Sequence, residues 1–448
     1  MKTCWLVLSL CWLLTLSCPA DETSDYDKYW PQWRGPEGTG MAPHGDPPVE
    51  WSEEKNVRWK LAIPGEGHAS PIVWGEVVYV LTAVKTEKTV EAGSGEAEQE
   101  PASGRRRRSR ARKPTNLYEY VVMAVDRKSG KVLWQKTACE ELPHEGKHAD
   151  GSWASPSPVT DGERLYAYFG SRGLFCYDME GELLWKKNFG DLTIAHSFGE
   201  GTSPALHGDM LVINWDHEGE SFICALNKKT GKEYWRKERD EPTSWGTPLI
   251  VDVDGDPQIV VNGTNRVRGY DLTTGFPIWE CGGMTRNTVP TPIEGDGRVF
   301  VMSGFRGAAL VAIDLAGASK DVTGTETVAW THDKRTPYVP SPLLDEGRLY
   351  FLATNTGVLS CFDADSGEAL YTGQKLDGIR GVYSSPVGAQ NRVYFSGRNG
   401  VFVVIKNSSS YEVLARNSLD DSFSASPAIV GDELYLRGFK SLYCIACD

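Results

Sequence analysis

A Ser-Pro or Thr-Pro dipeptide followed by apolar residues recurs eight times along the chain of 448 residues. From the second copy onward the copies are 41–50 residues apart, and the first interval is longer because one unit carries an insertion. A period of this length, with four strand-like segments in each unit, is typical of a β-propeller. The copies are Ser70-Pro71, Ser157-Pro158, Ser203-Pro204, Thr247-Pro248, Thr291-Pro292, Ser341-Pro342, Ser385-Pro386 and Ser426-Pro427.

Four units carry a turn that begins with Asp or Asn and closes with Ser-Gly or Thr-Gly. The first side chain can accept hydrogen bonds from backbone N–H groups two or three residues on, and the glycine adopts the positive φ that closes the hairpin. An aromatic residue at a fixed place on the outer strand of five units is expected to fill the wedge between neighbouring blades. These aromatic residues are Trp134, Trp185, Trp235, Trp279 and Tyr371.

A slot for small side chains lies two residues before the Asp or Asn that ends the third strand. Seven cysteines follow residue 20, a number that leaves open a disulfide framework with one free thiol. Three of them occupy the slot, and equivalent positions of different blades are too far apart for a disulfide, so we interpret these three as small buried residues. The slot is filled by Ala124, Cys176, Ala225, Gly269, Ala312, Cys361, Val403 and Cys444.

The last unit stops at Asp448, before any outer strand with an aromatic residue. An isolated strand of that kind, residues 56–63 with Trp59, precedes the first unit. Pairing this strand with the last unit completes an eighth blade and covers its sheet edge. The expected fold is therefore all-β, an eight-bladed β-propeller over residues 56–448 whose last blade is closed by an N-terminal strand.

The N-terminus has the pattern of a secretory signal peptide over residues 1–20. A basic residue precedes the apolar run Cys4–Leu16, which is too short to span a membrane, and small residues predict cleavage after residue 20. A lipoprotein anchor at Cys18 is the alternative. We expect a separate N-terminal segment over residues 21–55 and export of the protein to the periplasm or the extracellular space.

The formal net charge of −13 argues against nucleic acid as a partner, because an acidic protein repels phosphate. The segment 84–116 interrupts blade one with acidic residues and then an arginine-rich run that includes Arg105–Arg108. It has almost no apolar residues, so we expect it to be disordered. Its basic half suits a polyanion or an acidic partner; the alternative is a solvated loop that its own acidic half neutralises in part.

The run Asp-x-x-[Ser/Thr]-Gly-x-x-x-Trp, as from Asp126 to Trp134, resembles the repeat of pyrroloquinoline-quinone-type, or quinoprotein-like, β-propellers. That superfamily includes quinoprotein alcohol dehydrogenases and outer-membrane assembly factor B. The opening Trp30-Pro-Gln-Trp-Arg-Gly-Pro36 is similar to a group of uncharacterised exported bacterial propellers. The resemblance spans residues 30–448 and implies the fold, but it implies no single function because the run is a packing device.

The dehydrogenases of this superfamily also imply a quinone, a Ca²⁺ ion, an Asp base and, in many members, a disulfide between adjacent cysteines. This chain has no adjacent cysteines and no position to which the Asp base can be assigned. Asp252-Val-Asp254-Gly-Asp256 resembles a calcium loop, with a polar β-turn as the alternative. We therefore expect no cofactor, and we keep pyrroloquinoline quinone with Ca²⁺ only for the alternative of an alcohol or sugar dehydrogenase.

The loops that lead into the Ser/Thr-Pro strands vary between units and converge at one end of the propeller axis, where propellers commonly bind. Aromatic and arginine side chains are typical anchors in such a mouth, and the arginines suit an anionic guest. The alternative is that these side chains pair with local carboxylates and close the channel. The candidate binding residues are His68, Trp153, His196, Glu200, Trp245, Arg286, Asn287, Arg335, Arg380 and Tyr383.

The sequence contains no Ser-His-Asp spacing, His-rich metal pattern or phosphate loop, so it predicts no catalytic residue. We expect a monomeric, non-enzymatic binding or scaffold protein that does not span a membrane and that recognises a protein or a small anionic ligand. The alternatives are the quinone-dependent dehydrogenase and a scaffold for envelope assembly.

Overall fold

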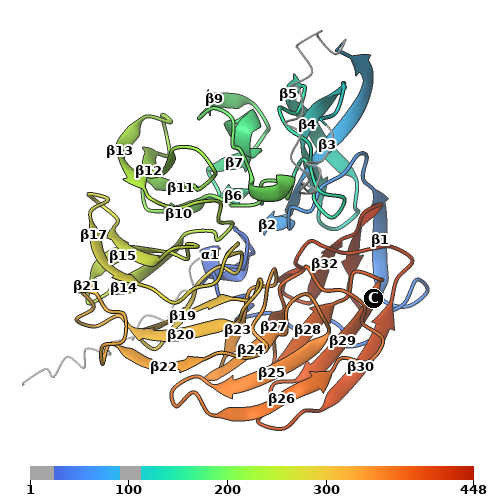
Figure 1. Cartoon of the computed structure of the whole chain (residues 1–448). Helices are drawn as coiled ribbons and strands as arrows, with labels where there is room; N and C mark the ends of the chain where they lie inside the picture. Colours follow the sequence, from blue (N-terminus) through green and yellow to red (C-terminus); the bar gives the residue numbers. More distant parts are fainter. Residues whose placement is uncertain (1–24, 91–112, 448) are drawn as a thin grey trace, which may run out of the picture.

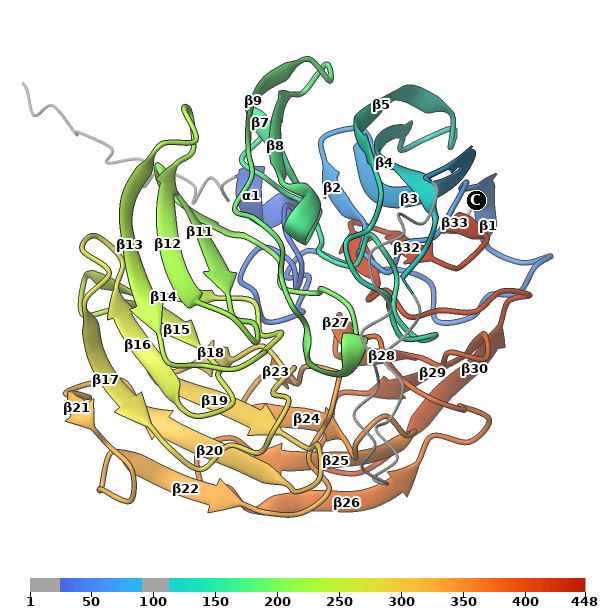
Figure 2. The ribbon, with the colours of Figure 1, turned by 45° about the horizontal axis from the view of Figure 1, so that its top comes forward.

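The computed structural model describes residues 25–90 and 113–447. In this part of the chain, eight antiparallel sheets surround a central axis, with the outer strands at the rim (Figures 1 and 2). Each sheet has four strands, and blade four gains a fifth, two-residue strand. The predicted eight-bladed propeller is confirmed. The signal peptide predicted over residues 1–20, with Cys18, lies outside the described residues.

In each of the first seven blades the chain runs from the innermost strand to the outermost. The strands of blades one to four are β2 (Ile72–Trp74), β3 (Val77–Thr89), β4 (Asn116–Asp126) and β5 (Val132–Glu141); β6 (Val159–Thr160), β7 (Arg164–Tyr168), β8 (Leu174–Asp178) and β9 (Leu183–Lys187); β10 (Ala205–His207), β11 (Met210–Trp215), β12 (Ser221–Asn227) and β13 (Glu233–Arg239); and β14 (Leu249–Val253), β15 (Asp256–Val261), β16 (Val267–Asp271) and β17 (Pro277–Cys281) with β21 (Lys320–Asp321).

The strands of blades five to eight are β18 (Ile293–Gly295), β19 (Arg298–Ser303), β20 (Ala309–Asp314) and β22 (Val328–His332); β23 (Leu343–Asp345), β24 (Arg348–Leu352), β25 (Val358–Asp363) and β26 (Ala369–Lys375); β27 (Val387–Ala389), β28 (Arg392–Ser396), β29 (Val401–Lys406) and β30 (Val413–Ser418); and β31 (Ala428–Val430), β32 (Glu433–Arg437), β33 (Ser441–Ile445) and β1 (Val57–Ala62). The short helices are α1 (Asp25–Lys28), η1 (Gly170–Arg172) and η2 (Ala195–Ser197). No helix among the described residues is long and apolar enough to span a membrane.

The N-terminal strand closes the ring as predicted. β1 pairs antiparallel with β33, with Trp59 opposite Cys444 and Ala62 opposite Ser441. Trp59 is only 8% exposed and belongs to the apolar cluster that joins blades eight, seven and one. This pairing ties the two chain ends together. The outermost strand of blade eight, β1, comes from the N-terminal part of the chain, and the other three strands come from its C-terminal end.

The tryptophans of the outer strands lie between blades, as predicted. The indole N–H of Trp134 donates to the carbonyl of Met179 in the next blade, at 3.2 Å, and the ring covers Gly181. A Cβ on Gly181, which has φ +87°, would come within 2.9 Å of that ring, so only glycine fits. The same pairing recurs for Trp59 on Gly130, Trp185 on Gly231, Trp235 on Gly275 and Trp330 on Gly367.

Trp279 differs from the other outer tryptophans. Its indole N–H donates to Gln258 of its own blade, at 3.1 Å. The ring is buried in the cluster that joins blades four and five. Trp279 therefore lies between two blades, as predicted, but its hydrogen-bond partner differs from that of the other outer tryptophans.

The predicted Asp turns and the small-residue slot are also present. Asp126 Oδ1 accepts the backbone N–H of Ser129 at 2.8 Å, as the turn chemistry requires. All eight slot residues are buried, and the seven cysteines are unpaired in the described part of the chain. Burial raises the pKa of the Cys176, Cys361 and Cys444 thiols to about 12, which keeps them protonated and unreactive.

The predicted disordered insertion, residues 84–116, overlaps strand residues at both of its ends. β3 continues to Thr89 and β4 begins at Asn116, and the two strands stay paired out to those residues. The polar residues of these strand ends give no local sign of a strand, because their apolar contact is made with a residue from another connection. Tyr118 packs edge-on against Trp153, with ring centroids 5.8 Å apart. Residues 91–112 lie outside the described residues, so disorder there remains a prediction.

The N-terminal segment crosses one face of the ring from blade one to blade seven. Trp30 pairs with Val73 of blade one, and Met41 pairs with Gly388 of blade seven. We call this face, which also carries the Asp turns, the back face. The opposite face carries the loops that lead into the innermost strands, and we call it the front face.

Candidate functional site

The Ser and Thr residues of the repeated dipeptide form a closed ring of hydrogen bonds around the axis. The backbone N–H of each one donates to the side-chain oxygen of the equivalent residue in the next blade, at 2.9–3.1 Å. The ring closes where the Ser426 N–H donates to Ser70 Oγ, at 2.9 Å. The hydroxyl is thus the acceptor that links neighbouring blades, and the proline that follows it has no N–H in need of a partner.

We expect Ser385→Ala to lower the free energy of unfolding by about 1–3 kcal/mol, because it leaves the buried N–H of Ser341 without its acceptor. Ser385→Thr is the control, since Thr247 and Thr291 fill the same role in other blades. Urea denaturation of the two variants measures the effect. Equal loss in both variants would show that the hydroxyl does not provide the stabilisation.

The N-terminal segment closes the back end of the channel. Arg34 is 2% exposed, and its guanidinium donates to the carbonyls of Pro342 and Pro386 in blades six and seven. Burial without a carboxylate partner lowers the pKa of Arg34 to about 9. Trp33, beside it, lines cavities on both sides of the segment and donates its N–H toward Ser426 Oγ. Trp33 is therefore the floor of the space that opens to the front face.

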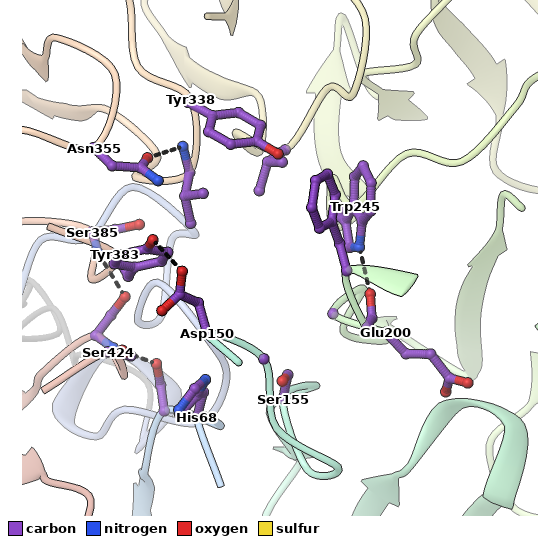
Figure 3. Close-up of a pocket in the computed structure, with 18 of the residues that line it drawn as sticks. His68, Asp150, Ser155, Glu200, Trp245, Tyr338, Asn355, Tyr383, Ser385 and Ser424 are labelled. Atoms are coloured by element: carbon purple, nitrogen blue, oxygen red, sulfur yellow. Dashed lines mark hydrogen bonds between the residues drawn. The ribbon is translucent and has the colours of Figure 1, made fainter. Parts of the chain in front are cut away.

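That space, the front cavity, has a volume of about 410 Å³ and lies on the axis. Its base is Trp33 with Ser residues of the ring. Its walls carry aromatic side chains from several blades (Figure 3). A volume in this range with apolar walls and a few polar groups is typical of small-molecule sites. The aromatic wall residues are Phe198, Trp245, Phe305, Tyr338 and Tyr383.

The structure brings four of the ten predicted binding residues into this lining. His68 and Tyr383 lie on one side of the front cavity, and Trp245 and Glu200 lie on the other (Figure 3). The indole N–H of Trp245 donates to the carbonyl of Gly199 at 2.7 Å, which fixes the ring against the wall. The Glu200 carboxylate accepts the backbone N–H of Ser171 at 2.7 Å.

The other six predicted residues lie outside the lining. Arg286, Arg335 and Arg380 are exposed, as is His196, whereas Asn287 is buried. Trp153 packs against Tyr118 instead. The three arginines therefore do not give the front cavity the positive bias expected from the sequence, although their part in binding remains a prediction.

A different arginine borders the front cavity. Arg398 lies over the ring of Tyr383, with its guanidinium carbon 4.7 Å from the centroid, and 5.5 Å from the centroid of Phe439. Phe439 stacks in turn on His68, at a centroid distance of 5.0 Å and an angle of 29°. Residues from blades one, seven and eight thus form one stack that holds a cation at the wall.

Asp150 is the acidic partner of this stack. Arg398 donates to its Oδ1, and the hydroxyl of Tyr383 donates to its Oδ2 at 3.1 Å (Figure 3). Asp150 belongs to the connection between blades one and two, whereas both donors belong to blade seven. Despite its burial, the hydrogen bond and charge of Arg398 hold the pKa of Asp150 below its ordinary value, so the carboxylate is ionised.

The two sides of the front cavity differ in charge. Burial, and then the charges of Arg398, Lys147 and Arg437, lower the pKa of His68 to about 3, so this imidazole is neutral at pH 7. On the other side, burial raises the pKa of Glu200 to about 7, although its hydrogen bonds from Ser171 oppose the shift. The charges that act on His68 are therefore mainly positive, with Asp150 opposing them, and the Glu200 carboxyl on the other side is only partly ionised at pH 7.

The candidate calcium residues form a hairpin turn. Asp254 and Gly255 occupy the tip between β14 and β15 at positive φ, and Asp252 Oδ1 accepts the N–H of Gly255 at 2.8 Å. In the described part of the chain no group of three His, Cys, Asp or Glu side chains is placed to hold a metal. Asp252, Asp254 and Asp256 therefore do not form such a group among the described residues, and calcium binding at this turn stays a prediction.

The sequence model of one protein family, described as outer membrane protein assembly factor BamB, matches residues 119–372. That match covers more than half of the chain. The chain belongs to this family. No curated protein matches it significantly in sequence.

Solved structures show the same fold at low identity. BamB from Moraxella catarrhalis has a TM-score of 0.52 at 14% identity, covering 73% of this chain and 93% of its own. The quinohemoprotein alcohol dehydrogenase from Comamonas testosteroni scores 0.63 at 11% identity, covering 94% and 81%. A europium-containing methanol dehydrogenase scores 0.64 at 12% identity, covering 93% and 90%. At such identities the likeness concerns the fold alone, which family members share with enzymes and non-enzymes.

The lining of the front cavity does not fit pyrroloquinoline quinone with Ca²⁺. The quinone is a polycarboxylate, yet the lining residues include the acidic Asp150 and Glu200 and no Lys or Arg, and the Glu200 carboxylate itself is directed toward Ser171. Arg398, behind Tyr383, offers a cation for one carboxylate only. In the described part of the chain no three His, Cys, Asp or Glu side chains are placed to hold a metal, so carbonyl, amide or quinone oxygens would have to supply most ligands of a calcium ion.

Proposed function

We propose that the chain is an exported, non-enzymatic binding protein that holds a small organic ligand in the front cavity. The observation that carries this proposal is the cavity itself: about 410 Å³ on the axis, floored by Trp33 and walled by aromatic rings. Rings of this kind bind flat or apolar groups at little entropic cost, and the few polar groups fix the orientation. The signal-peptide pattern and the family support export.

The charges around the front cavity favour a ligand with one anionic group. The charges of Arg398, Lys147 and Arg437 act on His68 and Asp150 opposes them, while Lys147 also pairs with Glu66 at 3.2 Å. The opposite side holds the ring of Trp245, which suits an uncharged part of the ligand, and the Glu200 carboxylate there is hydrogen-bonded to Ser171. The anionic ligand predicted from Arg286, Arg335 and Arg380 is thus retained, with Arg398 as its anchor.

A cavity-filling substitution tests this proposal. Val289 lines the front cavity, whereas Val132 is 42% exposed on the outer strand β5. We expect affinity-selection mass spectrometry, with small molecules extracted from the producing cells, to find a compound that the wild type and Val132→Trp retain. Val289→Trp should bind it about tenfold more weakly or worse. Equal retention by both variants, or no retained compound, would overturn the proposal.

A further inference from the structure

The Arg398 guanidinium is held in place with most of its hydrogen-bonding capacity unused. Tyr383 and Phe439 flank it at 4.7 and 5.5 Å, and its side chain is 23% exposed. In the described part of the chain its one hydrogen bond runs from Nη1 to Asp150 Oδ1. A guanidinium presents five N–H donors in a planar fork that matches a carboxylate, so this group is preorganised to receive an oxyanion.

Asp150, which accepts the hydrogen bond of Arg398, lies at the end of a segment that spans the mouth of the front cavity. The segment, residues 142–151, leaves blade one, while Arg398 and Tyr383 belong to blade seven, with blade eight between them. On its other side the His148 N–H donates to the carbonyl of Ser197, at 2.6 Å. The Asp150 carboxylate is still 38% exposed and lines the front cavity.

We propose that Asp150 occupies the place of a ligand carboxylate. When the ligand binds, its carboxylate takes over the hydrogen bonds of Arg398 and Tyr383 from Asp150, and residues 142–151 are released from blade seven. This inference rests on the proposed function and adds the chemical class of the ligand. An internal carboxylate competes at a high effective concentration, so it lowers the observed affinity for an external one. Asp150 would then be a competitor of the ligand and not one of its contacts.

A competing interpretation predicts the opposite effect of removing the Asp150 charge on ligand affinity. If the ligand were cationic, Asp150 would be its anchor, and removal of that negative charge would weaken binding. Asp150→Asn separates the two cases because asparagine keeps the shape of the side chain and removes the charge. Asp377→Asn is the matched control, since Asp377 is 71% exposed and pairs with Arg416 on the outer side of the ring.

The probes are benzoate, benzamide and benzamidine, which have nearly the same shape and carry a negative, zero and positive charge. Ligand-observed NMR titrations measure their affinities. We expect the wild type to prefer benzoate, and Asp150→Asn to bind benzoate about tenfold tighter with little change for benzamide. Arg398→Gln should lose the preference for benzoate, and Asp377→Asn should behave as the wild type. Hydrogen exchange should show faster exchange in residues 142–151 when benzoate binds the wild type.

Weaker benzoate binding by Asp150→Asn, or a preference for benzamidine, would overturn this inference and leave the front cavity as a ligand site. Slower exchange, or no change, in residues 142–151 with benzoate bound would also overturn it. Failure of all three probes to bind either protein would contradict the carboxylate assignment. The comparison of Val289→Trp with Val132→Trp still decides separately whether the front cavity binds a ligand.

Discussion

Deletion of residues 50–63 is expected to abolish the cooperative unfolding transition of the whole propeller. The deletion removes β1, and with it Trp51 and Trp59, which are 3% and 8% exposed. Loss of a buried tryptophan side chain costs about 3–5 kcal/mol, and the total stability of a domain is about 5–15 kcal/mol. The deletion also leaves β33 as an unpaired edge, so the damage is not confined to one blade.

Differential scanning calorimetry with near-ultraviolet circular dichroism measures this effect. We expect the deleted protein to lack a sharp transition, and a synthetic peptide of residues 50–63, supplied in trans, to restore part of it by pairing with β33. A deleted protein that melts like the wild type would show that β1 does not close the ring energetically. The peptide also serves as a control for irreversible misfolding of the deleted protein, because a protein that cannot refold would not regain its transition when the peptide is added.

Arg239→Ala is expected to lower the free energy of unfolding by about 3–5 kcal/mol, because it leaves a buried carboxylate without its partner. The side chains of Arg239 and Asp216 are both 0% exposed, and Nε and Nη2 of Arg239 donate to the two carboxylate oxygens at 2.7 and 3.0 Å. Burial by itself lowers the pKa of Arg239, but Asp216, Tyr270 and Glu241 together outweigh burial and raise this pKa above its ordinary value.

Urea denaturation compares this variant with Arg416→Ala. Arg416 pairs with Asp377 at 3.4 Å, but both side chains are at least half exposed, so its loss should cost less than about 1 kcal/mol. A similar small loss in both variants would mean that the buried pair contributes no more than a surface pair. A loss for Arg239→Ala that persists at high salt would support the buried pair, because salt screens buried charges weakly.

Most of the fold was predictable because its determinants are local and repeated. An Asp that bonds an N–H three residues on, and a glycine that accepts a neighbouring tryptophan ring, leave the same sequence pattern in each unit, as at Asp126 and Gly130. The closure by β1 followed from counting strands. The extension of β3 to Thr89 was missed because its polar residues pair with β4, whose Tyr118 packs against Trp153 in another connection.

The candidate site was predicted less well because it depends on contacts between distant residues. Arg398 and Asp150 are 248 positions apart, and no local pattern links them. The predicted site comprised only the loops that lead into the innermost strands, yet the hairpin between β28 and β29, which carries Arg398, opens on the same face. A charge such as Arg286 can also point to solvent from a loop whose backbone lies at the mouth.

A crystal structure of the protein, incubated with the small-molecule fraction of the cells that produce it, tests most directly whether the front cavity is a ligand site. We expect electron density for an organic molecule between Tyr383 and Trp245, with an oxyanion within hydrogen-bond distance of Arg398. A front cavity that contains only water, with no bound molecule or with one bound only at another surface, would contradict this assignment.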